Sequence, residues 1–260
     1  MKQLVWMALI SVMSICAQQQ QPPPLARGYV SQIASGGGWK TTLTLFNTTS
    51  AQTQVAVFFR ADDGSPLSLP LVITQAGTRQ TGTAPQVGLT IQPLATLVIE
   101  SEAPAGSSTV TGSAEVLSRT RIPGSAIFRQ QGPDGRTVEA IAPVDYGVSA
   151  SIVVPFDNRD GAATGIALVN PTERQINLIM RSRNENGVEL DQSRLMLPPE
   201  GHTAFVIAER VRSLAGQQGT IEFMSPGDER FSGLGLRFSA TGGFTSVPVL
   251  QLREPLPTRP

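Results

Sequence analysis

The sequence matches itself when its first half is laid over its second half. Residues 41–64 align with residues 164–187 without a gap, and the phrases LFNTT at 45–49 and LVNPT at 168–172 fall in register. Seven of the 24 aligned positions are identical: Thr41/Thr164, Leu45/Leu168, Asn47/Asn170, Thr49/Thr172, Gln52/Gln175, Arg60/Arg183 and Gly64/Gly187. Internal similarity of this kind predicts repeated structural units in tandem.

Within the matched segment, apolar residues recur at every second position. Leu43 and Leu45 alternate with threonine, and Val55, Val57 and Phe59 follow the same spacing. Successive side chains of a strand point to opposite faces, so this period places one apolar row inward. Further strands are predicted at 67–73, 89–92, 95–101, 109–118, 124–130, 136–144, 151–156, 164–169, 175–183, 188–197, 202–208, 218–224, 232–239 and 243–251. About ten residues per strand and turn is typical of an antiparallel β-sandwich.

The match continues after residue 88 at a shorter offset. Leu89 aligns with Leu195, and the block 112–116 aligns with 219–223, so the first unit carries an extra polar segment around residues 75–88. We therefore predict an all-β chain of two tandem antiparallel Ig-like β-sandwich domains at 28–146 and 150–252, followed by a Pro-rich tail at 253–260. One interruption is expected at residues 208–214, where the spacing of apolar residues suits a short helical turn that crosses between sheets.

The repeated asparagine stands at the end of a strand in both copies. Its short amide can bond to the backbone two residues further on, and a proline or a threonine can follow in such a turn. Asn47-Thr48-Thr49 also fits a glycosylation acceptor, but Pro171 forbids that use in the second copy. The repetition therefore indicates turn chemistry.

The N-terminus has the pattern of a secretory signal. Lys2 precedes an apolar run from Leu4 to Ile15, and a small residue follows at Ala17. We predict a signal peptide over 1–17, a Gln/Pro-rich linker over 18–27, and a secreted, periplasmic or cell-surface location. Cys16 leaves lipidation open as an alternative, although the residues before it suit a lipoprotein signal poorly.

Three segments carry a resemblance to known proteins: 36–47 (GGGWKTTLTLFN), 233–238 (GLGLRF) and 244–248 (FTSVP). They resemble repeats of secreted bacterial proteins with tandem Ig-like or fibronectin-like sandwich domains, most of which are uncharacterised. The resemblance implies an exported sandwich array and transfers no catalytic residue.

The residues that usually carry catalysis or bind metals are scarce. Cys16 is the only cysteine and His202 the only histidine, which excludes the usual zinc ligand sets. We expect His202 to be a solvent-facing residue at a strand edge. Asp157–Gly161 is the best calcium candidate, but Arg159 interrupts it and a polar loop is the simpler interpretation. We predict no enzyme, cofactor or metal site.

The sequence balances 20 basic against 20 acidic residues, which argues against a nucleic-acid partner. Trp39 beside three glycines, and Arg181 and Arg183 on one strand, are the candidate ligand contacts. We predict a non-catalytic structural, adhesive or assembly module with an unidentified protein or glycan partner at the cell envelope. The alternatives are a carbohydrate-binding module that uses Trp39 and, second, a hydrolase. No transmembrane segment is expected in the mature chain.

Overall fold

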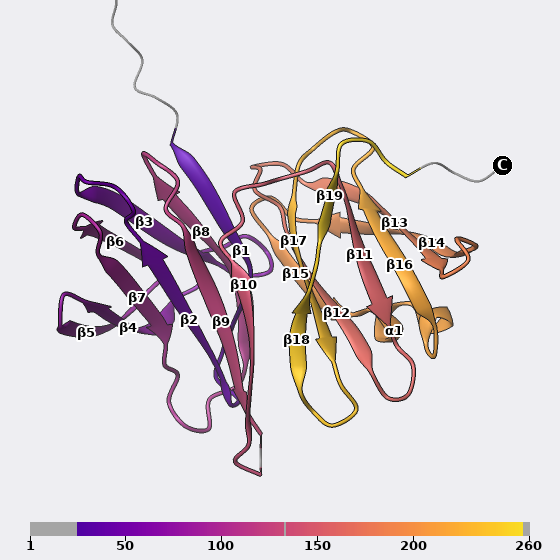
Figure 1. The fold of residues 1–260 in the computed structure, drawn as a ribbon, viewed down its shortest axis with the longest axis horizontal. Helices are drawn as coiled ribbons and strands as arrows, with labels where there is room; N and C mark the ends of the chain where they lie inside the picture. Colours follow the sequence, from indigo (N-terminus) through magenta and orange to yellow (C-terminus); the bar gives the residue numbers. More distant parts are fainter. Residues whose placement is uncertain (1–24, 133, 257–260) are drawn as a thin grey trace, which may run out of the picture.

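The computed structural model describes residues 25–132 and 134–256 and is built almost entirely of antiparallel strands (Figure 1). The all-β sandwich predicted from the alternating pattern is confirmed. The predicted signal peptide at 1–17, Cys16 and most of the predicted 18–27 linker lie outside the described residues.

The first half of the chain forms two sheets. One has the order β1-β8-β3-β6, and the other has the order β10-β9-β2-β7-β4-β5. The strands of the first sheet are β1 (Ala26–Ser35), β3 (Thr53–Arg60), β6 (Gln86–Ile91) and β8 (Val110–Ser118). Those of the second are β2 (Trp39–Phe46), β4 (Leu69–Gln75), β5 (Thr78–Ala84), β7 (Thr96–Ser101), β9 (Gly124–Gln131) and β10 (Thr137–Pro143).

The second half also forms two sheets, with the orders β14-β13-β16-β11-β19 and β15-β12-β17-β18. The strands of the first of these are β11 (Ser151–Asp157), β13 (Ile176–Asn184), β14 (Glu189–Leu197), β16 (Gln218–Met224) and β19 (Leu250–Leu252). Those of the other are β12 (Ala163–Val169), β15 (His202–Val206), β17 (Ser232–Phe238) and β18 (Phe244–Val247).

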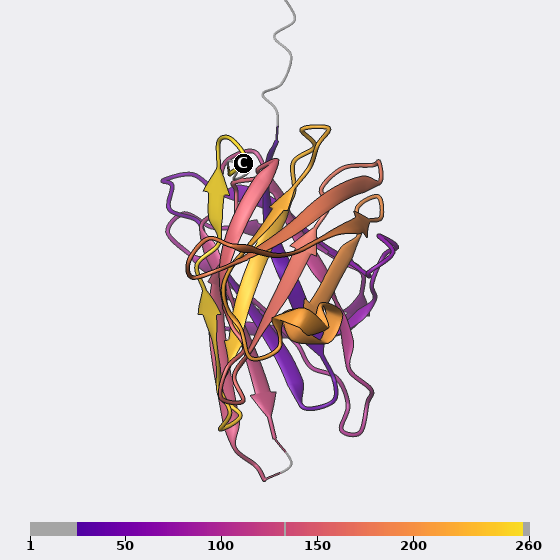
Figure 2. The same ribbon diagram turned by 90° about the vertical axis from the view of Figure 1, so that its right-hand side faces the viewer.

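The crossover expected at 208–214 is present. The helix α1 (Ile207–Arg210) and the 3₁₀ turn η1 (Arg212–Leu214) connect β15 in one sheet to β16 in the other. Ile207 and Leu214 are fully buried, so the short turn is held by the apolar core on its inner side. Figure 2 shows the orange coiled ribbon of this short helical crossover at the side of the sheets.

Two strands were not predicted from the sequence, for opposite reasons. In β1, most side chains on both faces are buried, so its apolar and polar residues do not alternate. In β5, nearly every side chain is exposed, and the sequence TRQTGTA contains no apolar row to detect. A further difference is that the region 243–251 divides at Pro248 into β18 and β19.

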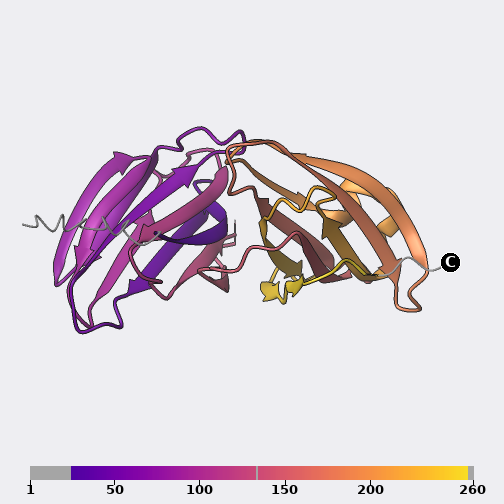
Figure 3. The same cartoon turned by 90° about the horizontal axis from the view of Figure 1, so that it is seen from above.

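The inner faces of the sheets form two apolar clusters. The second-half cluster contains residues from that half alone, such as Phe156, Leu178 and Phe223. The other cluster fills the first-half sandwich and extends into Ala167, Leu234 and Phe244 of the second half. The two halves therefore pack against each other through an apolar surface, side by side as seen from above in Figure 3.

Candidate binding site at the junction of the two halves

Each repeated asparagine makes the same set of hydrogen bonds. The Asn47 amide donates to the carbonyls of Ala51 (2.7 Å) and Gln92 (3.0 Å), and its oxygen accepts from the Thr49 amide (3.0 Å). Both side chains are almost completely buried. The bond to the backbone two residues further on, expected from the sequence, is present in both copies.

In the second copy, the corresponding hydrogen bonds differ only slightly in length. Asn170 donates to the carbonyls of Arg174 (2.6 Å) and Pro198 (2.7 Å) and accepts from the Thr172 amide (2.9 Å). In both copies the asparagine joins its own turn to the end of a strand that lies far along the chain. Each asparagine thus ties its turn to a distant strand end by hydrogen bonds, and we call Asn47 and Asn170 the asparagine clamps. Their side-chain amides are buried and are not exposed for ligand binding.

His202 is buried at the contact surface between the two halves, which we call the seam. The expectation that it faces solvent is wrong, because its ring is enclosed by the first half. Its Nδ1 lies 2.8 Å from Oδ1 of Asp62, and its Nε2 lies 3.1 Å from Oε1 of Gln32. The Gln32 amide group donates to the carbonyl of Ile33, which fixes its oxygen toward the imidazole. Side chains of the first half therefore face both ring nitrogens of His202.

Polar contacts continue along the seam on either side of His202. Arg60 and Glu200 form an ion pair of 3.0 Å, and Ser232 donates to Asp145 at 2.7 Å. The backbones also approach closely at Gly64, where an added Cβ would lie 2.1 Å from the carbonyl oxygen of Pro199. Gly64 has a φ of 85°, so both its conformation and its contact require glycine.

Trp39 stands at the end of the apolar part of this junction. The centroid of its ring lies 5.3 Å from that of Phe244, and the centroid of the Phe238 ring lies 5.7 Å from that of Phe244. Trp39 is half-buried, so part of its ring faces the space beside these contacts. Trp39 is therefore partly packed against aromatic rings, and its use as a ligand contact stays a prediction.

That space is a groove of about 330 Å³, which we call the junction groove. Both halves contribute to its wall, and most of the lining is apolar. The first half supplies Gln32, Ala34, Trp39, Thr109, Thr111 and Phe128. The second half supplies Gly165, Ile166, Ala167, Ala204, Phe205, Val206, Glu209, Leu236 and Phe238. Ligand pockets occur preferentially at junctions of this kind.

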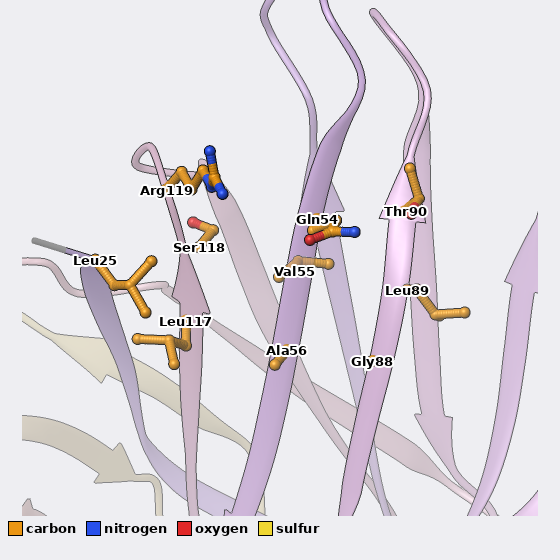
Figure 4. A pocket seen from close by; sticks show the side chains of 10 residues that line it. All are labelled: Leu25, Gln54, Val55, Ala56, Gly88, Leu89, Thr90, Leu117, Ser118 and Arg119. Atoms are coloured by element: carbon orange, nitrogen blue, oxygen red, sulfur yellow. The ribbon is translucent and has the colours of Figure 1, made fainter. Parts of the chain in front are cut away.

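A larger hollow lies on the outer face of the β1-β8-β3-β6 sheet (Figure 4). Its volume is about 670 Å³, and its lining includes Leu25, Leu117 and Arg119. Arg119 is the one ionisable side chain among its ten lining residues. This hollow is an open sheet face without converging polar groups, whereas the junction groove combines aromatic rings from two sheets. The junction groove is therefore the better candidate site.

Arg181 and Arg183 lie elsewhere, on β13 of the second half. Arg183 lies 3.2 Å and Arg181 3.9 Å from Oε2 of Glu222, a carboxylate whose side chain is 1% exposed. The backbone amide of Leu256 donates to the other oxygen of Glu222 at 2.8 Å. The structure does not bring these arginines to Trp39, and their use as a ligand contact stays a prediction.

The segment Asp157–Gly161, the best calcium candidate, has its Asp157 carboxylate paired with arginines. The Asp157 carboxylate lies 2.9 Å from Arg159 and 3.2 Å from Arg237, and the hydrogen bond from Arg159 is the main cause that lowers the pKa of Asp157 to about 2. Asn158 is turned inward and donates to the carbonyl of Leu214. The described residues contain no group of three or more side chains of the kinds that hold a metal ion.

The chain has no match among protein-family models, and no curated protein is significantly similar to it. Among residues 25–132 and 134–256, no helix is long and apolar enough to cross a membrane. The features of the described residues that bear on function are thus the junction groove, its half-buried tryptophan and the enclosed histidine.

Proposed function

We propose that this chain is a non-catalytic, exported β-sandwich protein that serves as a structural, adhesive or assembly module at the cell envelope or outside the cell. The observation that carries the proposal is the position of His202. Both nitrogens of the only histidine are held by side chains of the other half, so neither is available to activate a nucleophile.

The proposal includes two tandem domains that arose by copying. The sheet order β6-β3-β8-β1 has its counterpart in β14-β13-β16-β11, and β10-β9-β2-β7 has its counterpart in β18-β17-β12-β15. The matching networks of Asn47 and Asn170 support the same conclusion. The apolar seam then acts as a fixed joint, which suits a module that holds partners at a set distance.

Export is tested by producing the full chain with a C-terminal tag in a bacterial host and measuring the mass of the exported product. A chain that starts near Gln18 supports the proposal, and one that carries lipid at Cys16 supports its membrane-anchored form. A chain that stays in the cytoplasm with Met1 retained overturns the exported role.

The non-catalytic part is tested with ester and glycoside substrates on the native protein and on His202→Gln. We expect no turnover by either protein. A hydrolysis that the native protein performs and the correctly folded His202→Gln variant has lost would contradict the proposal and favour a hydrolase.

Carbohydrate binding is the second candidate, and the half-buried ring of Trp39 in the junction groove favours it. A glycan array with the native chain and Trp39→Ala tests it. Binding that disappears in Trp39→Ala supports this function, whereas a blank array removes it.

A further inference from the structure

The two halves differ at one edge of otherwise matching sheets. In the first half, β7 pairs with β2 on one side and with β4 on the other. In the second half, β15 holds the place of β7 and pairs with β12. No strand among the described residues pairs with its other side, so the position that β4 fills in the first half is open beside β15.

The backbone of β15 is oriented for such pairing. The backbone N–H of Asn170 donates to the carbonyl of Gly201 at 2.9 Å. Along an antiparallel ladder, residues that bond to the neighbouring strand alternate with residues that do not. His202 and Ala204 therefore direct their backbone groups away from β12. The amide of His202 donates to the carbonyl of Asp62 in the first half. The N–H and C=O of Ala204 have no backbone partner in the described part of the chain.

The equivalent residue in the first half already has a strand partner. The backbone N–H of Asn47 donates to the carbonyl of Ala95, just as the backbone N–H of Asn170 donates to the carbonyl of Gly201. Val98 therefore corresponds to Ala204. Val98 faces Thr74 of β4, and Glu100, two residues on, faces Val72. A segment in the same register would face Ala204 and Val206 of β15.

The junction groove lies along this open edge. Ala204 and Val206 form part of its wall, and the rings of Trp39 and Phe238 form another part. Alternate side chains of an added strand would point into the groove, because strand side chains alternate between faces. The groove offers them mainly apolar contacts.

One charge stands at the groove. Glu209 is exposed, lines the groove, and forms no ion pair among the described residues. Arg210 lies 4.9 Å from the centre of the Phe205 ring and forms no ion pair with Glu209. A cationic side chain of a ligand is the complement of this carboxylate.

We propose that the junction groove binds an extended peptide segment, which adds to the open edge of β15 as β4 adds to β7. The segment places an apolar side chain against Trp39 and Phe238 and a lysine or arginine next to Glu209. Strand addition to an exposed edge is an established mode of peptide recognition. The choice of a peptide rests on the assembly role proposed above.

The chain itself supplies the probe. A synthetic peptide of residues 69–75 with lysine in place of Pro70, LKLVITQ, is labelled with a fluorophore and titrated with the full chain. We expect saturable binding by fluorescence anisotropy and slower hydrogen exchange at the Ala204 amide. The Ala204→Pro variant removes the outward N–H and leaves the ladder to β12 intact, so it should bind at least about tenfold more weakly.

The carboxylate is tested separately. Glu209→Gln should weaken binding of LKLVITQ about threefold and leave binding of the unchanged peptide LPLVITQ as it was. Glu173→Gln, which alters another exposed glutamate, is the matched control and should have no effect. Thermal unfolding of each variant confirms that it is folded.

Several results would overturn the proposal: no binding at millimolar peptide, binding that Ala204→Pro leaves unchanged, or an Ala204 amide that is not protected. Equal affinity for a peptide with glutamate at position 70 would overturn the cationic contact. A dimer that protects Ala204 without peptide would assign the edge to a second copy. Retention of Met1 in the cytoplasm affects only the exported role, so the two failures are distinguishable.

Discussion

The first and second halves have the same order in eight of their strands but protect different edges. The first half covers β7 with the hairpin β4–β5. In the second half no strand of the described residues pairs with the outer side of β15, and the short strand β19 covers β11. The strands shared by both halves form the sandwich. The strands that are not shared determine which backbone edge remains available to another chain.

The same contrast holds for one acidic residue on the central strand of each equivalent sheet. Glu115 on β8 pairs with Arg27, whose side chain is 54% exposed. Glu222 on β16 is enclosed by Arg181, Arg183 and the backbone of Leu256. A similar carboxylate is therefore 12% exposed and paired with an exposed arginine in one half, and 1% exposed and paired with buried arginines in the other. The C-terminal segment accounts for part of that difference.

The largest difference between the halves is expected at these two carboxylates. Glu222→Gln removes the buried carboxylate that faces Arg181 and Arg183, although Arg181 keeps its ion pair with Glu189 at 3.3 Å, and should lower the free energy of unfolding by about 3–5 kcal/mol. Glu115→Gln breaks a pair whose arginine is exposed to solvent and should cost less, about 1 kcal/mol. Urea unfolding of both variants measures the two effects. Equal losses would show that the burial of Glu222 has no energetic consequence.

The two asparagine clamps should instead behave alike. Asn47→Ala and Asn170→Ala each leave buried carbonyl groups without a donor, at a cost of about 1–3 kcal/mol for each unsatisfied group. Urea unfolding should therefore give losses that agree within about 1 kcal/mol. A loss confined to one variant would mean that the repeated phrase has a structural role in one half alone.

Alkaline pH should lower the stability of the first half and of its connection to the second. The chain's two tyrosines, Tyr29 and Tyr146, both lie there. Burial, followed by the nearby charge of Glu115, raises the pKa of Tyr29 from 10.0 to about 12. The folded state thus holds its proton more tightly than the unfolded state. This contribution to stability is complete below pH 10 and is lost as pH rises from 10 to 12.

Thermal unfolding between pH 9 and 12, compared for the native chain and Tyr29→Phe, measures that contribution. We expect the native chain to lose stability more steeply than the variant over this interval. Parallel curves would show that Tyr29 titrates alike in the folded and unfolded states.

Acid should lower the stability of the second half through Asp157. This is the smallest of the four effects predicted here for the two halves. Its pKa is lowered from 3.8 to about 2, so its contribution is complete above pH 4 and is lost as pH falls toward 2. Arg159 and Arg237 are substantially exposed, and solvent screens such pairs. Asp157→Asn should therefore cost less than about 1 kcal/mol at pH 7 and nothing at pH 2. A loss that is the same at both pH values would contradict the ion-pair origin.

The sequence predicted the elements that follow simple local rules. Strands such as β3 and β16 were found because one face is apolar and the other polar, and a two-residue period records that difference. The asparagine turns were found because their bonds join neighbouring residues. The short crossover was found because Val211 and Leu214 have helical spacing.

The elements that sequence reasoning missed depend on what lies beside them. β1 carries no alternation because the second half buries its outer face, and β5 carries none because it is an exposed edge. Trp39 was recognised as a candidate contact from its glycine-rich surroundings, but Phe244, on which its ring packs, lies about 200 residues further along the chain.

By itself, then, the sequence determined that this chain forms antiparallel sandwiches with repeated turns, because backbone preferences and side-chain alternation act over a few residues. Only the tertiary structure decided that His202 is enclosed by Asp62 and Gln32, that Glu222 is buried, and that β15 keeps an open edge beside an aromatic groove. Each of these features arises where two distant segments meet, and the local pattern of either segment carries no record of the other.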